Sequence, residues 1–272
     1  MAFSMSSIHV AINSVLALRA GQLKAEESSM KSKSDLVRSV FQTSEWHLKA
    51  AYNIRIRRET VQEFLKYESF TRILDIGCGD GSLSLPLLTS ERHLTLLDFS
   101  ETMLSLVRSR IPNELTDHVE LLNQNVLSAS LRPRSYDLIL CVGVLAHVES
   151  PNALLEKIIS WLKPGGSLIL QNTEADHVLT SVARLLERIR SVLRPKLYDR
   201  NQLRSSELIG VLTRRNFDLQ AAFSYGLPLL GMRRIASQET LYRAVRLAYG
   251  AYPAARLSSS GNECLYFLKS RP

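Results

Sequence analysis

The sequence predicts an open α/β sandwich built on a mostly parallel β-sheet. From Thr71 onward, short β-branched and apolar runs alternate with segments of helical periodicity, which is typical of successive βα units. The chain has 272 residues, of which 45% are apolar and 22% are charged. A chain of this length and composition can bury a substantial core. We therefore expect one elaborated domain with appended segments rather than a disordered chain.

Seven apolar runs have the length and composition of strands, and together they would form one sheet. The predicted strands are Arg72–Ile76, Leu94–Asp98, Val119–Gln124, Tyr136–Val142, Ser167–Thr173, Phe217–Tyr225 and Glu263–Lys269. Helices should connect them and cover both faces of the sheet. Clear examples are Glu101–Arg110 and Ala153–Leu162, the second of which is followed by the stop signal Pro164-Gly165-Gly166.

Further helical segments lie outside the minimal sheet. Residues 31–67 are expected to form two helices, and Val178–Leu193 another, interrupted at Pro195. In open α/β sheets ligands bind beyond the carboxyl ends of the strands, so additions there would cover the site and shape an acceptor pocket. We expect an N-terminal helical extension or lid at 1–50, and a main domain at 51–272 with helical cap segments at about 178–202 and 230–257.

A glycine-rich turn directly follows the first strand. Residues 73–81 have the sequence Ile-Leu-Asp-Ile-Gly-Cys-Gly-Asp-Gly and lead into Ser82–Leu88, which is expected to be helical. Glycine permits a tight turn and lets a ligand approach the backbone. A dinucleotide site would need Gly-x-Gly-x-x-Gly, but position 82 is serine and the third glycine is Gly81. The pattern therefore argues against a nicotinamide dinucleotide.

A carboxylate ends each of the first two strands. Asp75 can accept a hydrogen bond from a ligand ammonium group. Asp98 lies 21 residues after Gly77, where an acid can accept hydrogen bonds from both hydroxyls of a ribose. The two features together predict a nucleoside-type ligand that carries a positive charge.

These residues resemble the class I S-adenosylmethionine (SAM)-dependent methyltransferases, over a stretch from about Tyr52 to Thr173 with a weaker tail to Lys269. The stretch from Tyr136 to Val148 and the sequence Leu162-Lys163-Pro164-Gly165-Gly166 look most like the quinone-biosynthesis O-methyltransferase branch. The resemblance implies a Rossmann-like, seven-stranded fold, with SAM as cofactor and S-adenosyl-L-homocysteine as its product.

The resemblance also implies which residues hold the cofactor. Phe99 would pack on adenine with Met103 one turn later, although Met103 equally fits a core role. Asn125 stands where the family usually has an adenine-binding aspartate, and its carbonyl can still accept a hydrogen bond. Arg57, with Arg55 and Arg58 as alternatives, corresponds to an arginine that holds the SAM carboxylate. The expected cofactor-binding set is Arg57, Asp75, Gly77, Cys78, Gly79, Asp98, Phe99, Met103, Asn125, Val126 and Val142.

His147, just beyond the fourth strand, is the candidate general base for a hydroxyl acceptor. A turn-capping or packing role is the alternative, and His177 and Glu174 are weaker candidates. The glutamates that the quinone branch can use near a metal are replaced by Gly143 and Ala146. The remaining histidines, His9, His47, His93 and His118, lack metal-ligand spacing. We therefore expect no metal, and the pattern does not favour a quinone substrate.

Positive charge is concentrated in the last third of the chain. The formal net charge is +8, and Ser181–Arg256 holds 14 Arg or Lys against 5 Asp or Glu. This excess could attract an anionic or carrier-bound acceptor, or an anionic membrane surface, whereas a solvated helix face is the alternative. Aromatic residues do not alternate with the arginines, which argues against nucleic acid as a partner.

The three cysteines, Cys78, Cys141 and Cys264, have no paired spacing, which favours a reducing cytoplasm. Residues 1–25 lack acidic residues, so a transit peptide is the alternative to an amphipathic helix. The stretch Ile8–Ala20 is shorter than the roughly 20 apolar residues of a membrane span. The predicted reaction is methyl transfer to an oxygen of a small, lipophilic metabolite. The alternatives are carbon or nitrogen methylation, or a SAM-binding accessory protein without turnover.

Overall fold

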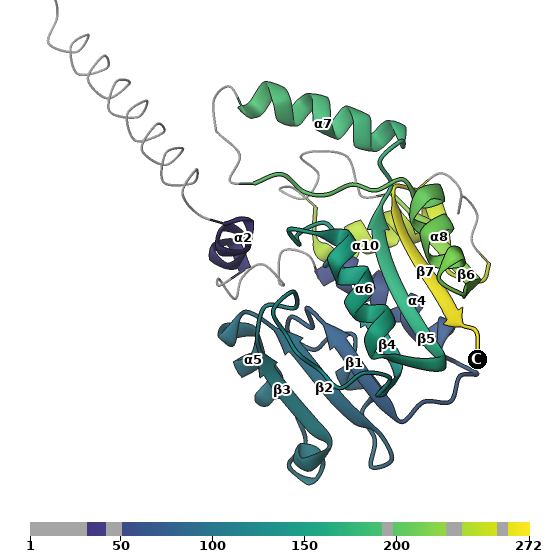
Figure 1. Cartoon of the computed structure of the whole chain (residues 1–272). Helices are drawn as coiled ribbons and strands as arrows, with labels where there is room; N and C mark the ends of the chain where they lie inside the picture. Colours follow the sequence, from purple (N-terminus) through teal and green to yellow (C-terminus); the bar gives the residue numbers. More distant parts are fainter. Residues whose placement is uncertain (1–31, 42–50, 192–197, 227–235, 255–260) are drawn as a thin grey trace, which may run out of the picture.

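A single seven-stranded sheet organises the computed structural model, which describes residues 32–41, 51–191, 198–226, 236–254 and 261–272 (Figure 1). The strand order is β3-β2-β1-β4-β5-β7-β6. β7 is antiparallel to both of its neighbours, and the other pairs are parallel. The strands are β1 Arg72–Ile76, β2 His93–Asp98, β3 Val119–Asn123, β4 Tyr136–Cys141, β5 Leu162–Thr173, β6 Phe217–Tyr225 and β7 Glu263–Ser270. The predicted α/β fold class is confirmed.

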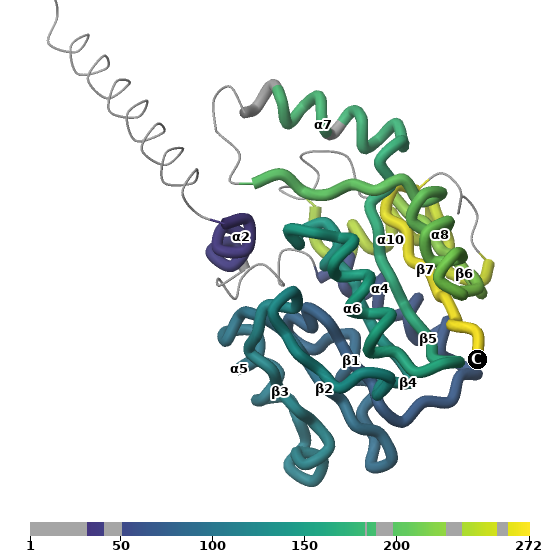
Figure 2. Tube along the Cα trace, in the orientation of Figure 1, coloured from purple at the N-terminus to yellow at the C-terminus, as the bar shows by residue number. Residues whose placement is uncertain are grey.

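Helices pack on both faces of this sheet and bury two apolar clusters. One face is covered by α4 (Ala51–Phe64), α5 (Glu101–Arg108) and α10 (Gln238–Tyr249), and the other by α6 (Pro151–Trp161) and α8 (Ser205–Arg214). Two short 3₁₀ segments, η1 (Leu85–Leu87) and η2 (Asn113–His118), complete the connections. The remaining helices, α2 (Lys33–Phe41) and α7 (Val178–Ser191), lie outside these layers (Figures 1 and 2).

The start of α6 shows how local sequence sets an element. The Ser150 side chain accepts a hydrogen bond from the Ala153 backbone N–H at 3.2 Å, and Pro151 supplies the first helical residue. Apolar side chains then recur at helical spacing and face the sheet, namely Leu154, Leu155, Ile158 and Trp161. The helix ends at Trp161, and β5 begins immediately at Leu162, five residues earlier than predicted.

The prediction of a helix at Ser82–Leu88 is wrong. These residues form turns and the short η1, with Gly81 at φ +73° before them. Pro86 lies inside the stretch, where it lacks the N–H that an α-helix needs and its ring clashes with the preceding turn. The connection after β1 is therefore shorter and tighter than the sequence pattern suggested.

The described parts of the predicted cap segments have different surroundings. α10 packs against α4 and β6, and Leu241 and Val245 are buried in the same cluster as Ile56. This helix belongs to the layer on the sheet, and its cap role stays a prediction. Residues 1–31, 42–50, 192–197, 230–235 and 255–257 lie outside the described residues, and so does the stretch considered as a transit peptide. Within the described ranges, no helix combines the length and hydropathy of a transmembrane span.

Truncation of a core side chain on α6 tests the packing of this layer. Leu154 is fully buried, so Leu154→Ala should lower the free energy of unfolding by roughly 2–5 kcal/mol through lost contacts and a cavity. Leu247→Ala on α10 removes a leucine that is 74% exposed and should change stability by about 0.5 kcal/mol or less. Urea unfolding of both variants measures the difference. Equal losses would contradict the assigned packing of α6.

Candidate cofactor and acceptor site

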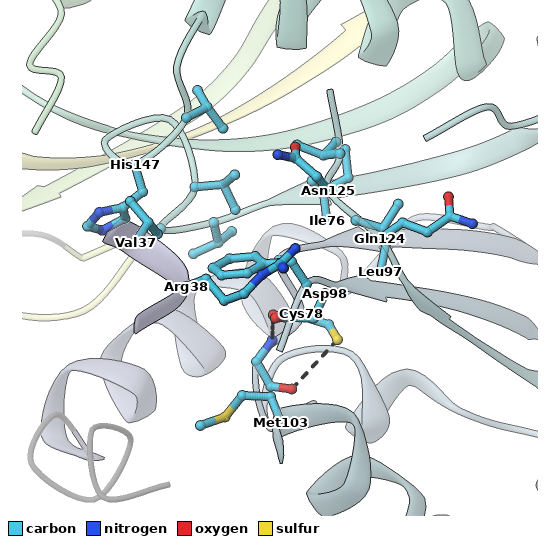
Figure 3. Close-up of a pocket in the computed structure, with 18 of the residues that line it drawn as sticks. Val37, Arg38, Ile76, Cys78, Leu97, Asp98, Met103, Gln124, Asn125 and His147 are labelled. Atoms are coloured by element: carbon cyan, nitrogen blue, oxygen red, sulfur yellow. Dashed lines mark hydrogen bonds between the residues drawn. The ribbon is translucent and has the colours of Figure 1, made fainter. Parts of the chain in front are cut away.

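A cavity opens at the carboxyl ends of β1, β2 and β4 and is covered on one side by α2 (Figure 3). Nearly all of the predicted site residues line it: Arg57, Gly77, Cys78, Gly79, Asp98, Phe99, Met103, Asn125, Val126, Val142 and His147. The parallel register explains this convergence, because β1 pairs with β2 on one side and with β4 on the other. Their carboxyl ends therefore meet at one edge.

The glycine-rich turn forms the floor of the cavity. Gly77 and Gly79 adopt φ values of +65° and +54°, which are unfavourable for residues with a Cβ. A Cβ at Gly79 would meet no heavy atom of the described residues within 4 Å, so the backbone there is open to a ligand. The backbone N–H groups of Gly77 and Cys78 both donate to Leu97 O, at 2.7 and 3.2 Å, which fixes the turn against β2.

Asp98 joins the end of β2 to this turn. Its Oδ2 accepts from the Gly79 N–H at 2.9 Å and its Oδ1 accepts from the Ser100 N–H at 2.8 Å. Burial raises the pKa of Asp98, and the backbone donors of Ser100, Gly79 and Phe99 limit the rise. A carboxylate oxygen has two acceptor sites, so the group can still accept ribose hydroxyls.

Asp75 does not line the cavity, and the expected contact of its carboxylate with the ligand stays a prediction. Side chains alternate along a strand, so Asp75 shares the face of Ile73, under α4 and α5, while Ile76 borders the cavity. Burial raises the pKa of Asp75 to about 7, and the nearby carboxylates of Asp98 and Asp80 act in the same direction.

Arg57 reaches the cavity from α4 beside Gly143. Its side chain is only 14% exposed, and its guanidinium lies 3.7 Å from Glu263 Oε2 on β7. The Arg57 Nε has no hydrogen-bond partner among the described residues, and neither has Oε1 of the buried Gln171. A Cβ at Gly143 would lie 3.2 Å from Arg57 Nη1 and 3.9 Å from Gln171 Oε1. A polar recess with one unused donor and one unused acceptor therefore lies behind Gly143.

Gln171 was missed by the sequence reasoning. Its only signal is a polar residue directly after the apolar run Leu168-Ile169-Leu170 of β5. Its Nε2 donates to Glu263 Oε2, so the orientation of its amide depends on β7, the neighbouring antiparallel strand.

α2 adds another wall that the sequence did not identify in detail. Ser34, Val37 and Arg38 line the cavity, and in Figure 3 the side chains of Val37 and Arg38 come from α2 toward the group that includes Asp98. The guanidinium of Arg38 lies 5.9 Å from the centre of the Phe99 ring. The Lys33 ammonium donates to Asn201 Oδ1 at 2.9 Å. The helix therefore lies against both the predicted adenine wall and the segment after α7.

Asn125 connects α2 to the loop after β3. Its Oδ1 accepts from the Leu127 N–H at 2.9 Å, and its Nδ2 donates to Ser34 Oγ at 3.0 Å. The amide thus stabilises its own turn, while the carbonyl oxygen has a second acceptor site for an adenine amino group. Val126 and Val142 contribute apolar side chains to the lining of the cavity.

His147 lies in the cavity wall in a buried, positively charged environment. Burial, together with the positive charges of Arg200, Arg57 and Lys33, lowers its pKa to about 4. Its Nδ1 lies 2.8 Å from the Tyr198 hydroxyl, in a contact where either group can donate, depending on the tautomer. The imidazole is therefore neutral at pH 7, with its tautomer coupled to Tyr198.

The two weaker candidates, His177 and Glu174, do not line the cavity. His177 Nδ1 accepts from the Leu179 N–H at 3.1 Å, and Glu174 accepts from the backbone N–H groups of Asp176 and Ser205. Both side chains thus hold local backbone in place. Among the described residues, no group of three or more His, Cys, Asp or Glu side chains is placed to hold a metal ion.

Comparisons with known proteins add to this geometry. Residues 74–168 match the model of a methyltransferase domain family. Over 102 residues the chain is 35% identical to the ubiquinone biosynthesis O-methyltransferase of Aeromonas salmonicida. The matched stretch covers 36% of this chain and 42% of that protein. It is 28% identical over 129 residues to the demethylmenaquinone methyltransferase of Listeria welshimeri, covering 46% of this chain and 54% of that one. The chain thus spans about half the length of these relatives.

Among solved structures, the magnesium protoporphyrin IX methyltransferase of Synechocystis with bound S-adenosyl-L-homocysteine superposes with a TM-score of 0.59. The identity is 16%, and the match covers 89% of this chain and 100% of that one. The agreement therefore concerns the fold. Together with the strand order, the superposition shows that the chain has the Rossmann-like fold of methyltransferases, and the methyltransferase domain match covers residues 74–168.

Proposed function

We propose that this chain transfers the methyl group of SAM to an oxygen of a small, lipophilic acceptor. One observation carries the proposal: a single cavity brings together an open glycine-rich turn, the Asp98 carboxylate and the neutral His147. An acid next to such a turn suits the ribose of a nucleoside cofactor. The apolar wall formed by Val37, Val142 and Val144 suits an acceptor with little charge.

The residues present fit SAM. Asp98 would accept hydrogen bonds from the ribose hydroxyls, and the open backbone at Gly79 leaves room for the methionine part of SAM. Phe99 and Arg38 would enclose the adenine, with Asn125 accepting from its amino group. The unused Nε of Arg57 would donate to the carboxylate of the methionine part, and the unused Oε1 of Gln171 suits its ammonium. When bound, SAM supplies an electrophilic methyl carbon on a positively charged sulfur.

The protein's part in the reaction would be alignment, exclusion of water and movement of one proton. Methyl transfer is a direct displacement, so holding the acceptor oxygen in line with the methyl carbon removes much of the barrier. His147 would take the hydroxyl proton on Nε2 as the new oxygen–carbon bond forms. Nε2 carries a lone pair only when the proton sits on Nδ1, so the Tyr198 oxygen must accept from Nδ1 rather than donate to it. Tyr198 is therefore a positioning residue for His147.

The described structure weakens the proposal of an anionic acceptor. Many arginines of the basic segment form ion pairs with carboxylates, including Arg200, Arg204, Arg215, Arg243 and Arg246. These pairs favour a solvated, mutually neutralised surface over an acceptor site. The three cysteines are free and buried, which supports a reducing compartment such as the cytoplasm for the reaction.

Binding and turnover separate the alternatives. Calorimetry with SAM tests the cofactor site. Detection of methylated product by mass spectrometry tests the reaction, with acceptors that offer a hydroxyl oxygen, an amine nitrogen or a nucleophilic carbon. Methylation at carbon or nitrogen would correct the acceptor atom. SAM binding without product from any acceptor would favour the accessory protein.

Asp98→Asn tests the ribose contact. Loss of the charge should weaken SAM binding roughly ten- to hundredfold, because hydrogen bonds to charged groups contribute about 1.5–3 kcal/mol. Asp117→Asn, at an exposed position in η2, is the matched control and should bind SAM like the unaltered protein. Calorimetry measures both constants, and circular dichroism checks folding. Unchanged affinity in Asp98→Asn would remove the ribose assignment.

Arg57→Met tests the carboxylate contact and uses its neighbour as control. The variant should bind SAM roughly tenfold more weakly or worse, since it loses a charge-assisted hydrogen bond. It should bind decarboxylated SAM as well as the unaltered protein does, because that ligand lacks the group that Arg57 would contact. Arg58→Met should leave both affinities unchanged. If Arg58→Met instead shows the selective loss, the assignment moves to that residue.

His147→Ala tests the base. We expect a roughly 10²–10⁴-fold loss of kcat with unchanged SAM affinity, whereas His177→Ala should retain turnover. The pH profile gives a second readout. Because the pKa of His147 is lowered to about 4, the imidazole stays neutral above that pH and protonates as the pH falls through it. kcat/KM should therefore hold level from neutral pH and fall only near pH 4. A fall centred near the usual histidine value of 6.5 would contradict the described environment.

A further inference from the structure

α7 carries an apolar stripe on its outer surface. Val178, Val182, Leu185 and Leu186 are 72%, 46%, 59% and 36% exposed. Their spacing of four, seven and eight residues from Val178 places all four on one face of the helix. Burial of such side chains is favourable, so a continuous exposed stripe indicates a surface that contacts something apolar.

The opposite side of α7 attaches the helix to the domain, so the orientation of the stripe is fixed. Thr180 is 1% exposed, and its Oγ1 accepts from the Asn262 Nδ2 at 3.3 Å. Leu179, at the edge of the stripe, lies near Gly226. In Figure 1, α7 lies beyond the layers that cover the sheet, with its long axis across that end of the molecule. The stripe therefore faces away from the protein body.

α7 itself carries a net positive charge on its polar side, where Arg184 also donates to the Ala175 carbonyl oxygen. α7 contains three arginines, Arg184, Arg188 and Arg190, against the single acid Glu187. Arg184 and Arg188 are exposed. An amphipathic helix with an apolar face and arginines on its polar side suits the interface of a bilayer with anionic headgroups, where the apolar face enters the acyl boundary.

One end of the segment that carries α7 contacts the cavity wall, and the other end is attached to the segment beyond α7. Glu174, just after β5, forms an isolated bridge with Leu203. Tyr198, beyond α7, contacts His147 in the cavity wall. A surface that holds α7 would thus hold the acceptor side of the cavity close to it.

We propose that α7 is a docking element for anionic lipid bilayers, with the stripe of Val178, Val182, Leu185 and Leu186 inserted at the headgroup boundary. The proposal that the acceptor enters from that surface rests on the proposed function, which assigns a lipophilic acceptor. The docking itself rests on the stripe and the arginines alone. Binding should weaken as salt rises, because part of the attraction is between exposed charges.

Vesicle co-sedimentation of the full-length protein tests the docking. The unaltered protein should bind vesicles of phosphatidylcholine mixed with phosphatidylglycerol, and bind pure phosphatidylcholine vesicles more weakly. Leu185→Asp should weaken binding to the anionic vesicles roughly tenfold or more, since it places a charge where the proposal inserts an apolar side chain at the headgroup boundary. Leu247→Asp places the same charge at an exposed leucine of α10 and should bind like the unaltered protein.

Three outcomes would overturn the docking proposal. The first is no binding of the unaltered protein to anionic vesicles. The second is an equal effect of Leu185→Asp and Leu247→Asp. The third is a dimer, seen by sedimentation velocity, that Leu185→Asp dissociates while vesicle binding is absent, because a second copy would then cover the stripe. Calorimetric binding of SAM without vesicles reports the cofactor site separately, so failure of docking and failure of the proposed function are distinguishable.

Discussion

The hydrogen bond from the Gly79 N–H to the Asp98 carboxylate joins the two parts of the proposed cofactor site, and much of the surrounding structure keeps it in place. The parallel pairing of β1 with β2 brings the turn and the acid to the same edge of the sheet. The positive φ values of Gly77 and Gly79 then direct the turn toward Asp98. Leu97 O receives two further N–H groups from the turn. These contacts hold the turn on its β2 side, so the backbone at Gly79 stays open toward the cavity.

On the acceptor side of the cavity, burial determines the protonation state of the key side chain, His147. His147 is kept neutral because burial and three cationic neighbours disfavour a further charge. Its neutrality makes a lone pair available at physiological pH, while Tyr198 determines which nitrogen carries it. A lowered pKa also makes His147 a weak base. The proposed reaction therefore depends more on alignment of the acceptor and exclusion of water than on a strong base.

Much of the sheet and of the cofactor site followed from local sequence, because apolar runs, turn glycines and strand-end acids are contiguous signals. β1 and β6 have the predicted bounds, and Gly77, Asp98 and His147 line one cavity, where their roles stay predictions. The misses depend on contacts between distant segments or on local chemistry within an apparently helical pattern. Arg38 reaches the cavity, and Gln171 approaches Gly143 in its wall, only through packing across the fold. Asp75 does not line the cavity, so its contact with the ligand stays a prediction. Pro86 lies within a stretch that periodicity predicted to be helical but that forms turns and the short η1.

β7 lies between β5 and β6, although it is the last strand to be made. Its first residue, Glu263, contacts both Arg57 and Gln171, so the recess behind Gly143 has all its walls only when that strand is in place. A nascent chain that has emerged only as far as β6 already contains the glycine turn, Asp98 and His147. It still lacks the contacts that orient the proposed ligands of the methionine part. The orientation of these proposed ligands therefore depends on a strand that follows nearly all of the other site residues in the chain.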